Sequence, residues 1–120
     1  MTMDTELLSN LVGCYFVLAI GYNLLSLILN DAKGQPLTSN KPVQAIVLVA
    51  LLYVIYVSEA ALGSGAWLFL MIVFLLLILR FGIYQHLAGY DETKYFSRSA
   101  WGAAIAINIF GVAVLTLSLF

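Results

Sequence analysis

The stretch WLFLMIVFLLLIL, residues 67–79, constrains the fold most, because no polar residue interrupts it. A membrane-spanning helix needs about 20 mostly apolar residues. A transmembrane β-barrel would need apolar and polar residues in alternation, which this stretch lacks. Four segments fit spanning helices: residues 7–29, 42–62, 66–84 and 100–120. The sequence therefore predicts an all-α integral membrane protein, a single domain of residues 1–120 with four transmembrane helices in an antiparallel up-down bundle.

The composition identifies lipid as the solvent of this chain. Of its 120 residues, 63% are hydrophobic and 9% are charged. A soluble domain is about 45–50% apolar and about 25% charged. A small soluble domain has too little interior to bury so many apolar side chains. The sequence also contains no basic patch with interleaved aromatic residues, so we expect no nucleic-acid partner.

The connectors between these segments contain residues that typically end and start helices. Gly34 and Pro36 lie in the first connector, and Pro42 suits the first turn of the helix that follows. The sequence GSG at residues 63–65 predicts a tight turn, so the second and third segments would form an antiparallel hairpin. The third connector is rich in aromatic residues, which favour the membrane–water interface.

The distribution of lysine and arginine predicts the orientation. Lys33 and Lys41 lie in the first connector, Lys94 and Arg98 lie in the third, and Arg80 is nearest to that same side. Connectors one and three share a side in a four-crossing chain, so the positive-inside rule places both in the cytoplasm. Both termini would then lie on the non-cytoplasmic side of the membrane, which we expect to be a bacterial inner membrane. This strong bias argues against transporters whose protomers insert in both orientations.

Three ionisable residues within or just beyond the predicted spans are functional candidates, because such residues are costly in lipid. Glu59 lies about 6 Å from the predicted turn, near the non-cytoplasmic boundary, either as a hydrated carboxylate or as a ligand, ion or proton site. Arg80 lies about 15 Å deeper, so the two cannot pair, and its long stem can reach the headgroups. His86, the only histidine, is a structural interfacial residue, a ligand or a proton relay.

Polar residues on several segments predict an internal polar seam. Tyr53, Tyr56 and Glu59 are spaced three residues apart, and tyrosines deep in lipid need hydrogen-bond partners. The partners would come from the first and fourth segments: Tyr15, Tyr22, Asn23, Ser26, Asn30 and Asn108. Such a seam either holds the helices together by hydrogen bonds or lines a solute path or a cavity.

Small residues predict where helices approach closely. Gly13 and Gly21 form a stripe on the first segment, and Gly102, Ala104 and Gly111 lie on two adjacent faces of the fourth. Small side chains allow close approach of helix backbones in membranes. The first and fourth segments are therefore expected to pack together or to form docking faces. The third segment is bulky all round, so it would face lipid or lie inside a larger assembly.

No catalytic motif is present, because the sequence contains no acid pair at a working distance, no cluster with metal-ligand spacing and no phosphate-binding loop. We therefore expect no metal, no motif indicates an enzyme or a cofactor, and an enzyme site between chains stays open. The expected partners are membrane lipid and either other membrane protein subunits or further copies of this chain.

Three functions are the main ones that remain open from the sequence, beside a membrane enzyme whose site lies between chains and a toxin or immunity factor. The first is a non-catalytic accessory subunit that packs against a larger membrane complex. The second is a homo-oligomeric transporter or channel for a small solute or ion, with Glu59 at the outer mouth and Tyr53 and Tyr56 along the path. The third is a pigment- or haem-associated membrane subunit that uses His86.

Overall fold

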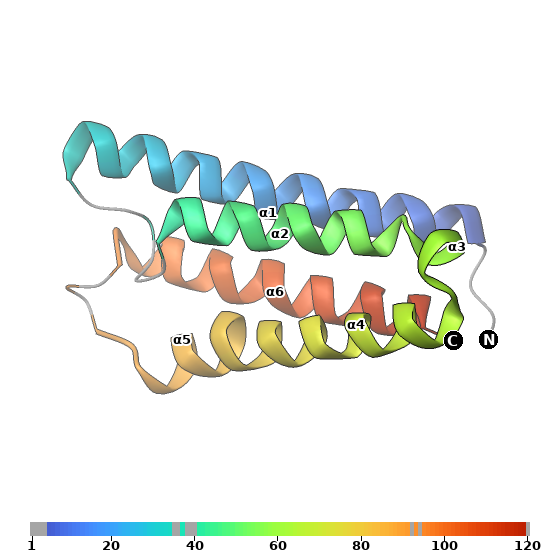
Figure 1. The fold of residues 1–120 in the computed structure, drawn as a ribbon. Coiled ribbons are helices and arrows are strands. Elements are labelled where there is room, and N and C mark those ends of the chain that lie inside the picture. The colour runs from blue at the N-terminus through green and yellow to red at the C-terminus, as the bar shows by residue number, and fades with distance from the viewer. Residues whose placement is uncertain (1–4, 35–36, 38–40, 92, 94, 120) are drawn as a thin grey trace.

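The computed structural model describes residues 5–34, 37, 41–91, 93 and 95–119, and these residues form helices and connectors without a β-strand (Figure 1). This result confirms the prediction of an all-α chain. The elements are α1 (Thr5–Lys33), α2 (Pro42–Tyr56), α3 (Glu59–Leu62), α4 (Ser64–Leu77), the π-helix η1 (Ile78–Tyr84), α5 (Gln85–Ala88) and α6 (Arg98–Ser118).

Three helices of the described chain are long and apolar enough to cross a membrane: α1, the continuous helix Ser64–Ala88 and α6. The fourth, α2, is apolar but has only 15 residues. At about 1.5 Å per residue it is roughly 22 Å long, which is less than the roughly 30 Å of the hydrocarbon core. The structure therefore contains three candidate spans and a shorter apolar helix, and the fourth crossing stays a prediction.

The second predicted helix is interrupted, so the expectation of one helix over residues 42–62 was wrong. Helix α2 ends at Tyr56, and α3 begins only at Glu59. At the break, the N–H of Ser58 donates to the carbonyl of Ile55 at 3.1 Å, and the Ser58 hydroxyl donates to the carbonyl of Val54. A serine hydroxyl that bonds back to its own helix competes with the backbone pattern and bends the helix.

The turn predicted at residues 63–65 is shorter than expected. Only Gly63 lies outside a helix, because Ser64 and Gly65 already belong to α4. The φ angle of Gly63 is +87°, a conformation that glycine adopts without the steric cost of a Cβ atom.

The helix ends also differ from the prediction. The third predicted helix, residues 66–84, extends to Ser64–Ala88 and includes η1, for which the sequence offered no signal. The first extends from residues 7–29 to Thr5–Lys33. The fourth begins earlier than residue 100, at Arg98, because Ser97 caps it by accepting the N–H of Ala100 at 3.0 Å.

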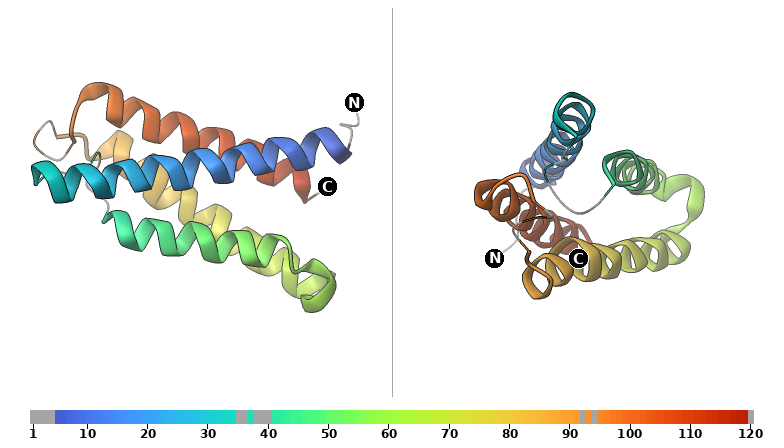
Figure 2. Two further views of the ribbon diagram at one scale, coloured as in Figure 1. Left: turned by 90° about the horizontal axis from the view of Figure 1, so that it is seen from above. Right: turned by 90° about the vertical axis from the view of Figure 1, so that its left-hand side faces the viewer.

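The helices lie side by side around a common axis, which the right-hand view of Figure 2 shows from one end. Helix α1 contacts α2 and α6, α2 contacts α4, and η1 contacts α6. We call one end of the molecule the turn end: it holds the start of α1, α3, the start of α4 and the end of α6 (Figure 1). The connector end holds the end of α1, the start of α2, α5 and the start of α6.

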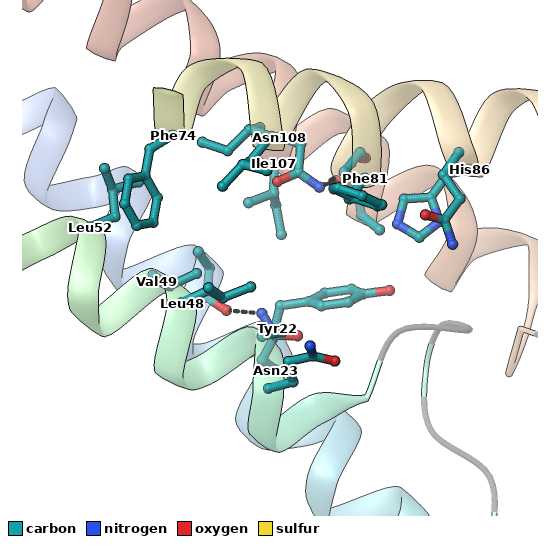
Figure 3. Close-up of a pocket in the computed structure, with 18 of the residues that line it drawn as sticks. Tyr22, Asn23, Leu48, Val49, Leu52, Phe74, Phe81, His86, Ile107 and Asn108 are labelled. Atoms are coloured by element: carbon teal, nitrogen blue, oxygen red, sulfur yellow. Dashed lines mark hydrogen bonds between the residues drawn. The ribbon is translucent and has the colours of Figure 1, made fainter. Parts of the chain in front are cut away.

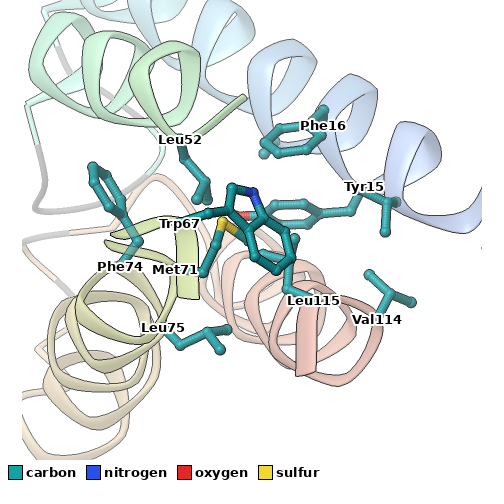
Figure 4. Packing of buried hydrophobic residues seen from close by; sticks show 11 residues of the cluster. Tyr15, Phe16, Leu52, Trp67, Met71, Phe74, Leu75, Val114 and Leu115 are labelled. Atoms are coloured by element: carbon teal, nitrogen blue, oxygen red, sulfur yellow. The ribbon is translucent and has the colours of Figure 1, made fainter. Parts of the chain in front are cut away.

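The hydrophobic core lies toward the turn end (Figure 4). Its buried members come from all four long helical stretches: Val12, Tyr15, Phe16, Ala19, Leu52, Trp67, Met71, Phe74, Leu75, Val114 and Leu115. A Cβ atom on Gly111 would overlap the ring of Tyr15. The missing side chain at Gly111 therefore lets α6 approach α1 closely.

Candidate functional site

A groove of about 530 Å³ lies between the helices toward the connector end (Figure 3). All the long helices contribute to it, so it runs through the centre of the helix assembly and is partly open to the surroundings. Its apolar lining includes Leu48, Val49, Leu52, Phe74, Ile78 and Ile107. Its polar lining consists of Tyr15, Tyr22, Asn23, Lys41, Gln44, Gln85, His86 and Asn108.

The lining changes in polarity along the groove. Figure 3 shows Leu52 and Phe74 together at one end, and Tyr22 and His86 at the other, with Phe81 beside His86. Asn108 lies between these ends. The groove is therefore amphipathic: one end suits an apolar chain, and the other suits a group that forms hydrogen bonds.

Asn108 fixes α6 against η1. Its Nδ2 donates to the carbonyl of Gly82 at 3.0 Å and to the carbonyl of Ala104 at 2.9 Å. A Cβ atom on Gly82 would come within 2.8 Å of the Asn108 amide, so only glycine allows this contact. Oδ1 of Asn108 accepts no hydrogen bond from the described residues, so it remains available to a ligand. A π-helix lies in the wall at this point, and such segments are frequent at functional sites.

Four other polar side chains have unused hydrogen-bonding capacity. The Tyr22 hydroxyl donates to the carbonyl of Ala100, which joins α1 to the start of α6 and leaves its oxygen able to accept. The Asn23 amide donates to the carbonyl of Ala19 at 2.8 Å and bonds nothing else among the described residues. Among the described residues, the side chains of Gln44 and Gln85 form no hydrogen bond, so they too can bind a ligand.

His86 lines the groove toward the connector end and is only 1% exposed. Its Nδ1 lies 2.8 Å from the hydroxyl of Tyr95, and its carbonyl accepts the indole N–H of Trp101 at 2.8 Å. Tyr90 stacks on Tyr95, with 5.7 Å between the ring centroids, and meets Trp101 edge-on. These contacts support the structural interpretation of His86, and its use as a haem or pigment ligand stays a prediction.

Glu59 and the two tyrosines nearest to it in sequence do not line the groove. Glu59 is exposed at the turn end, at the start of α3. The ring of Tyr53 is 49% exposed and meets Phe16 edge-on at 5.1 Å. Tyr56 also packs near Phe16, and its carbonyl accepts the indole N–H of Trp67 at 3.2 Å. These two tyrosines therefore belong to an aromatic cluster beside the core.

The residues of the predicted polar seam are consequently divided between different places. Tyr22, Asn23 and Asn108 line the groove. The Ser26 hydroxyl instead accepts the N–H of Leu37 at 2.8 Å, which holds the first connector against α1. Of the tyrosines predicted on α2, neither Tyr53 nor Tyr56 belongs to the described lining of the groove.

Arg80 lies on the outer surface of η1, away from the groove lining. Its guanidinium carbon lies 5.2 Å from the centroid of the Phe81 ring and 5.3 Å from that of the Tyr84 ring, which are cation–π distances. Among the described residues, neither Arg80 nor Glu59 forms an ion pair.

The small residues predicted to pack helices have different surroundings. Gly111 contacts Tyr15, and Ala104 is buried and lines the groove. A Cβ atom on Gly13, Gly21 or Gly102 would find no atom within 4 Å. These three glycines therefore leave open surface in this chain.

Gln44 and Gln85, which lie at the polar end of the groove, were not predicted from the sequence. For Gln44 a signal was available, because it lies within the predicted segment 42–62, where an uncharged amide costs free energy in lipid unless it is hydrogen-bonded. Among the described residues, no group of three or more His, Cys, Asp or Glu side chains is placed to hold a metal ion.

Comparison of the chain with protein-family models, characterised proteins and solved structures gave no match. Its function must therefore be argued from the groove and from the position of the helices in the membrane.

Proposed function

We propose that the chain crosses the membrane four times, as an antiparallel up-down bundle with its connector end in the cytoplasm. Lys33, Lys41 and Arg98 lie at the connector end, and a positively charged end is typical of the cytoplasmic side. Lys94, the other lysine on which the sequence prediction relied, lies outside the described residues. The short helix α2 would complete its crossing together with α3, because the two follow each other on the way to Gly63.

Labelling of single cysteines tests this orientation. In a Cys14→Ala background, Ser64→Cys is expected to react with a membrane-impermeant maleimide in intact cells. Lys33→Cys is expected to react only after the cytoplasmic face is exposed. The reverse pattern, or labelling of both positions in intact cells, would contradict the proposed topology.

The main proposal is that the protein is a non-catalytic subunit that binds an amphiphilic molecule of the membrane in the groove. The observation that carries it is the change in the lining, from Leu52 and Phe74 at one end to Tyr22 and His86 at the other. The volume of about 530 Å³ falls within the roughly 300–1,000 Å³ of small-molecule sites. Polar groups in such surroundings need hydrogen-bond partners, which a polar head would supply.

A variant that fills the groove tests the proposal. Ala45 lines the groove, so Ala45→Phe is expected to occupy part of it and to reduce the lipid that remains bound after purification. Ala50→Phe places the same side chain on the same helix at an exposed position outside the lining, and is expected to retain that lipid. Native mass spectrometry in a neutral detergent measures bound lipid directly. Equal retention by both variants would reject the groove as a binding site.

We further propose that this subunit works next to a larger membrane protein. Gly13, Gly21 and Gly102 support this role, because their open surroundings would let a partner helix approach closely. Native mass spectrometry of the protein extracted from its host membrane tests it. Co-extraction with an unrelated membrane chain at a fixed ratio is expected. A homo-oligomer without another chain would reject the accessory role and favour the transporter.

The structure offers no observation that favours transport by a single chain. Glu59 lies at the turn end, the groove lies toward the connector end, and the hydrophobic core lies between them. A path that uses Glu59 would therefore have to form between protomers. In that case Glu59→Gln would abolish flux and leave assembly intact.

A further inference from the structure

We infer that the ligand of the groove is an anionic amphiphile, with its phosphate or carboxylate near Lys41 and its apolar chain directed toward Leu52 and Phe74. This inference rests on the proposed binding function of the groove, and adds the charge of the head and the direction in which the molecule lies. Lys41, Leu52 and Phe74 all belong to the lining.

The charges of the lining determine the sign of the head. Among the described residues, Lys41 is the cation of the lining, and no aspartate or glutamate belongs to it. A positively charged head would therefore meet a positive side chain and no counter-charge. An anionic head would meet an exposed lysine that forms no ion pair with the described residues.

The start of α2 adds to the same positive potential. Lys41 immediately precedes Pro42, the first residue of α2, and the Lys41 side chain does not cap this helix end. The first N–H groups of a helix have no partner within the helix, and they attract negative charge. The charge of Lys41 and the helix end therefore act at the same part of the groove.

Neutral amides complete the polar end. Gln44 and Gln85 extend from α2 and α5, and their N–H groups can donate to the oxygens of a phosphate or a carboxylate. Asn23 adds a further amide from α1. Donors from three helices can therefore surround one anionic group, while the exposed lysine supplies the charge.

The apolar end sets the direction of the chain. Leu48, Val49 and Leu52 line one wall, and Phe74 lies opposite Leu52 (Figure 3). The polar end faces the connector end, which is proposed to lie in the cytoplasm. There the head would lie level with the headgroups of the cytoplasmic leaflet, the leaflet that carries anionic lipids.

The test compares lipids that share the same two oleoyl chains and differ in their heads. The full-length protein in a neutral detergent is titrated with phosphatidic acid, diacylglycerol and a trimethylammonium lipid, and native mass spectrometry measures the bound fraction. Phosphatidic acid is expected to bind most tightly and the trimethylammonium lipid least. Oleic acid, as a fourth probe, distinguishes a carboxylate head from a phosphate head.

Two lysine variants make the test specific to the groove. Lys41→Gln is expected to weaken binding of phosphatidic acid about fivefold, the effect of one lysine near a membrane surface, and to leave diacylglycerol binding unchanged. Lys33→Gln removes the same charge outside the lining and is expected to have a smaller effect.

The outcomes separate this inference from the proposed binding function. Equal affinity for the three oleoyl lipids, or no effect of Lys41→Gln, would overturn the anionic head. Ala45→Phe would still reduce binding in that case, and the groove would remain a ligand site. If Ala45→Phe changed the binding of no probe, the groove itself would be rejected and the inference with it.

Discussion

The two ends of the molecule pack the same helices in different ways. At the turn end Tyr15, Met71 and Leu115 fill the space between the helices, and Met71 and Leu115 are fully buried. Toward the connector end the helices enclose a groove of about 530 Å³. The molecule is therefore closed at one end and hollow toward the other.

The difference lies in how the helices are held together. At the turn end, large apolar side chains interlock, and Gly111 accommodates the ring of Tyr15. Toward the connector end, single polar side chains reach backbone carbonyls on a neighbouring helix: Tyr22 reaches Ala100, and Asn108 reaches Gly82. A hydrogen bond of this kind fixes a distance without filling the surrounding volume. Polar contacts can therefore hold a groove open where apolar packing would close it.

The largest loss of stability is expected from Met71→Ala, because Met71 is completely buried at the turn end. We expect a loss of about 2–3 kcal/mol in the free energy of unfolding, near the lower end of the range for soluble cores. The loss is smaller than in a soluble protein because lipid is as apolar as the core, so moving the side chain from lipid into the core contributes little free energy. The cavity left by the missing side chain therefore accounts for most of the loss. Unfolding in mixed detergent micelles measures this loss.

The matched control is Leu76→Ala on the same helix, where the side chain is 59% exposed. It removes apolar atoms without leaving an internal cavity, so the free energy of unfolding should change by less than about 0.5 kcal/mol. Equal losses in the two variants would show that the turn end does not contain a tightly packed core.

A smaller loss of stability is expected from Gly111→Ala. The added methyl group would overlap the ring of Tyr15, so α1 and α6 must separate or the ring must move. We expect a loss of about 1–2 kcal/mol in the free energy of unfolding, as for other overpacked sites. Gly102→Ala is the control on the same helix, because its new methyl group would meet no atom within 4 Å. If both variants unfold alike, close packing at Gly111 is not needed for stability.

The helical class and the membrane environment could be predicted because they depend on patterns along the chain. A composition of 63% hydrophobic and 9% charged residues indicates lipid as the solvent wherever these residues lie in the fold. The parts of the predicted fold that were wrong depend on single hydrogen bonds. The break before Glu59 involves one hydroxyl, that of Ser58, and no periodicity in the sequence reveals it.

The candidate site was predicted only in part, for a similar reason. Asn108 could be identified as a functional candidate because an amide in the middle of a membrane helix is costly. Its partner, the carbonyl of Gly82, could not be identified, because the contact depends on how α6 lies against η1. Glu59 was predicted as a functional candidate because an acid is costly in lipid. A charge near the end of a span can remain at the surface, however, and Glu59 is exposed.

The smallest effect is expected from Asn108→Ala, which tests the polar contacts around the groove. The variant loses the hydrogen bond to the carbonyl of Gly82, which joins α6 to η1. Interhelical hydrogen bonds in membranes contribute about 0.6 kcal/mol on average, so a loss of that size in the free energy of unfolding is expected. Asn23→Ala is the control, because the Asn23 amide bonds only to Ala19 of its own helix.

Hydrogen exchange gives the more informative readout for this pair. If the Asn108 contact fixes η1, amides of residues 78–84 should exchange faster in Asn108→Ala than in Asn23→Ala, while amides near Met71 stay protected. Faster exchange confined to η1 would show that the hollow part of the molecule depends on this contact and that the closed end is stable without it. Uniform exchange across the helix Ser64–Ala88 in both variants would mean that the two ends unfold as one unit. The groove would then owe its shape to the packing of the turn end, because that packing alone would hold the helices in place.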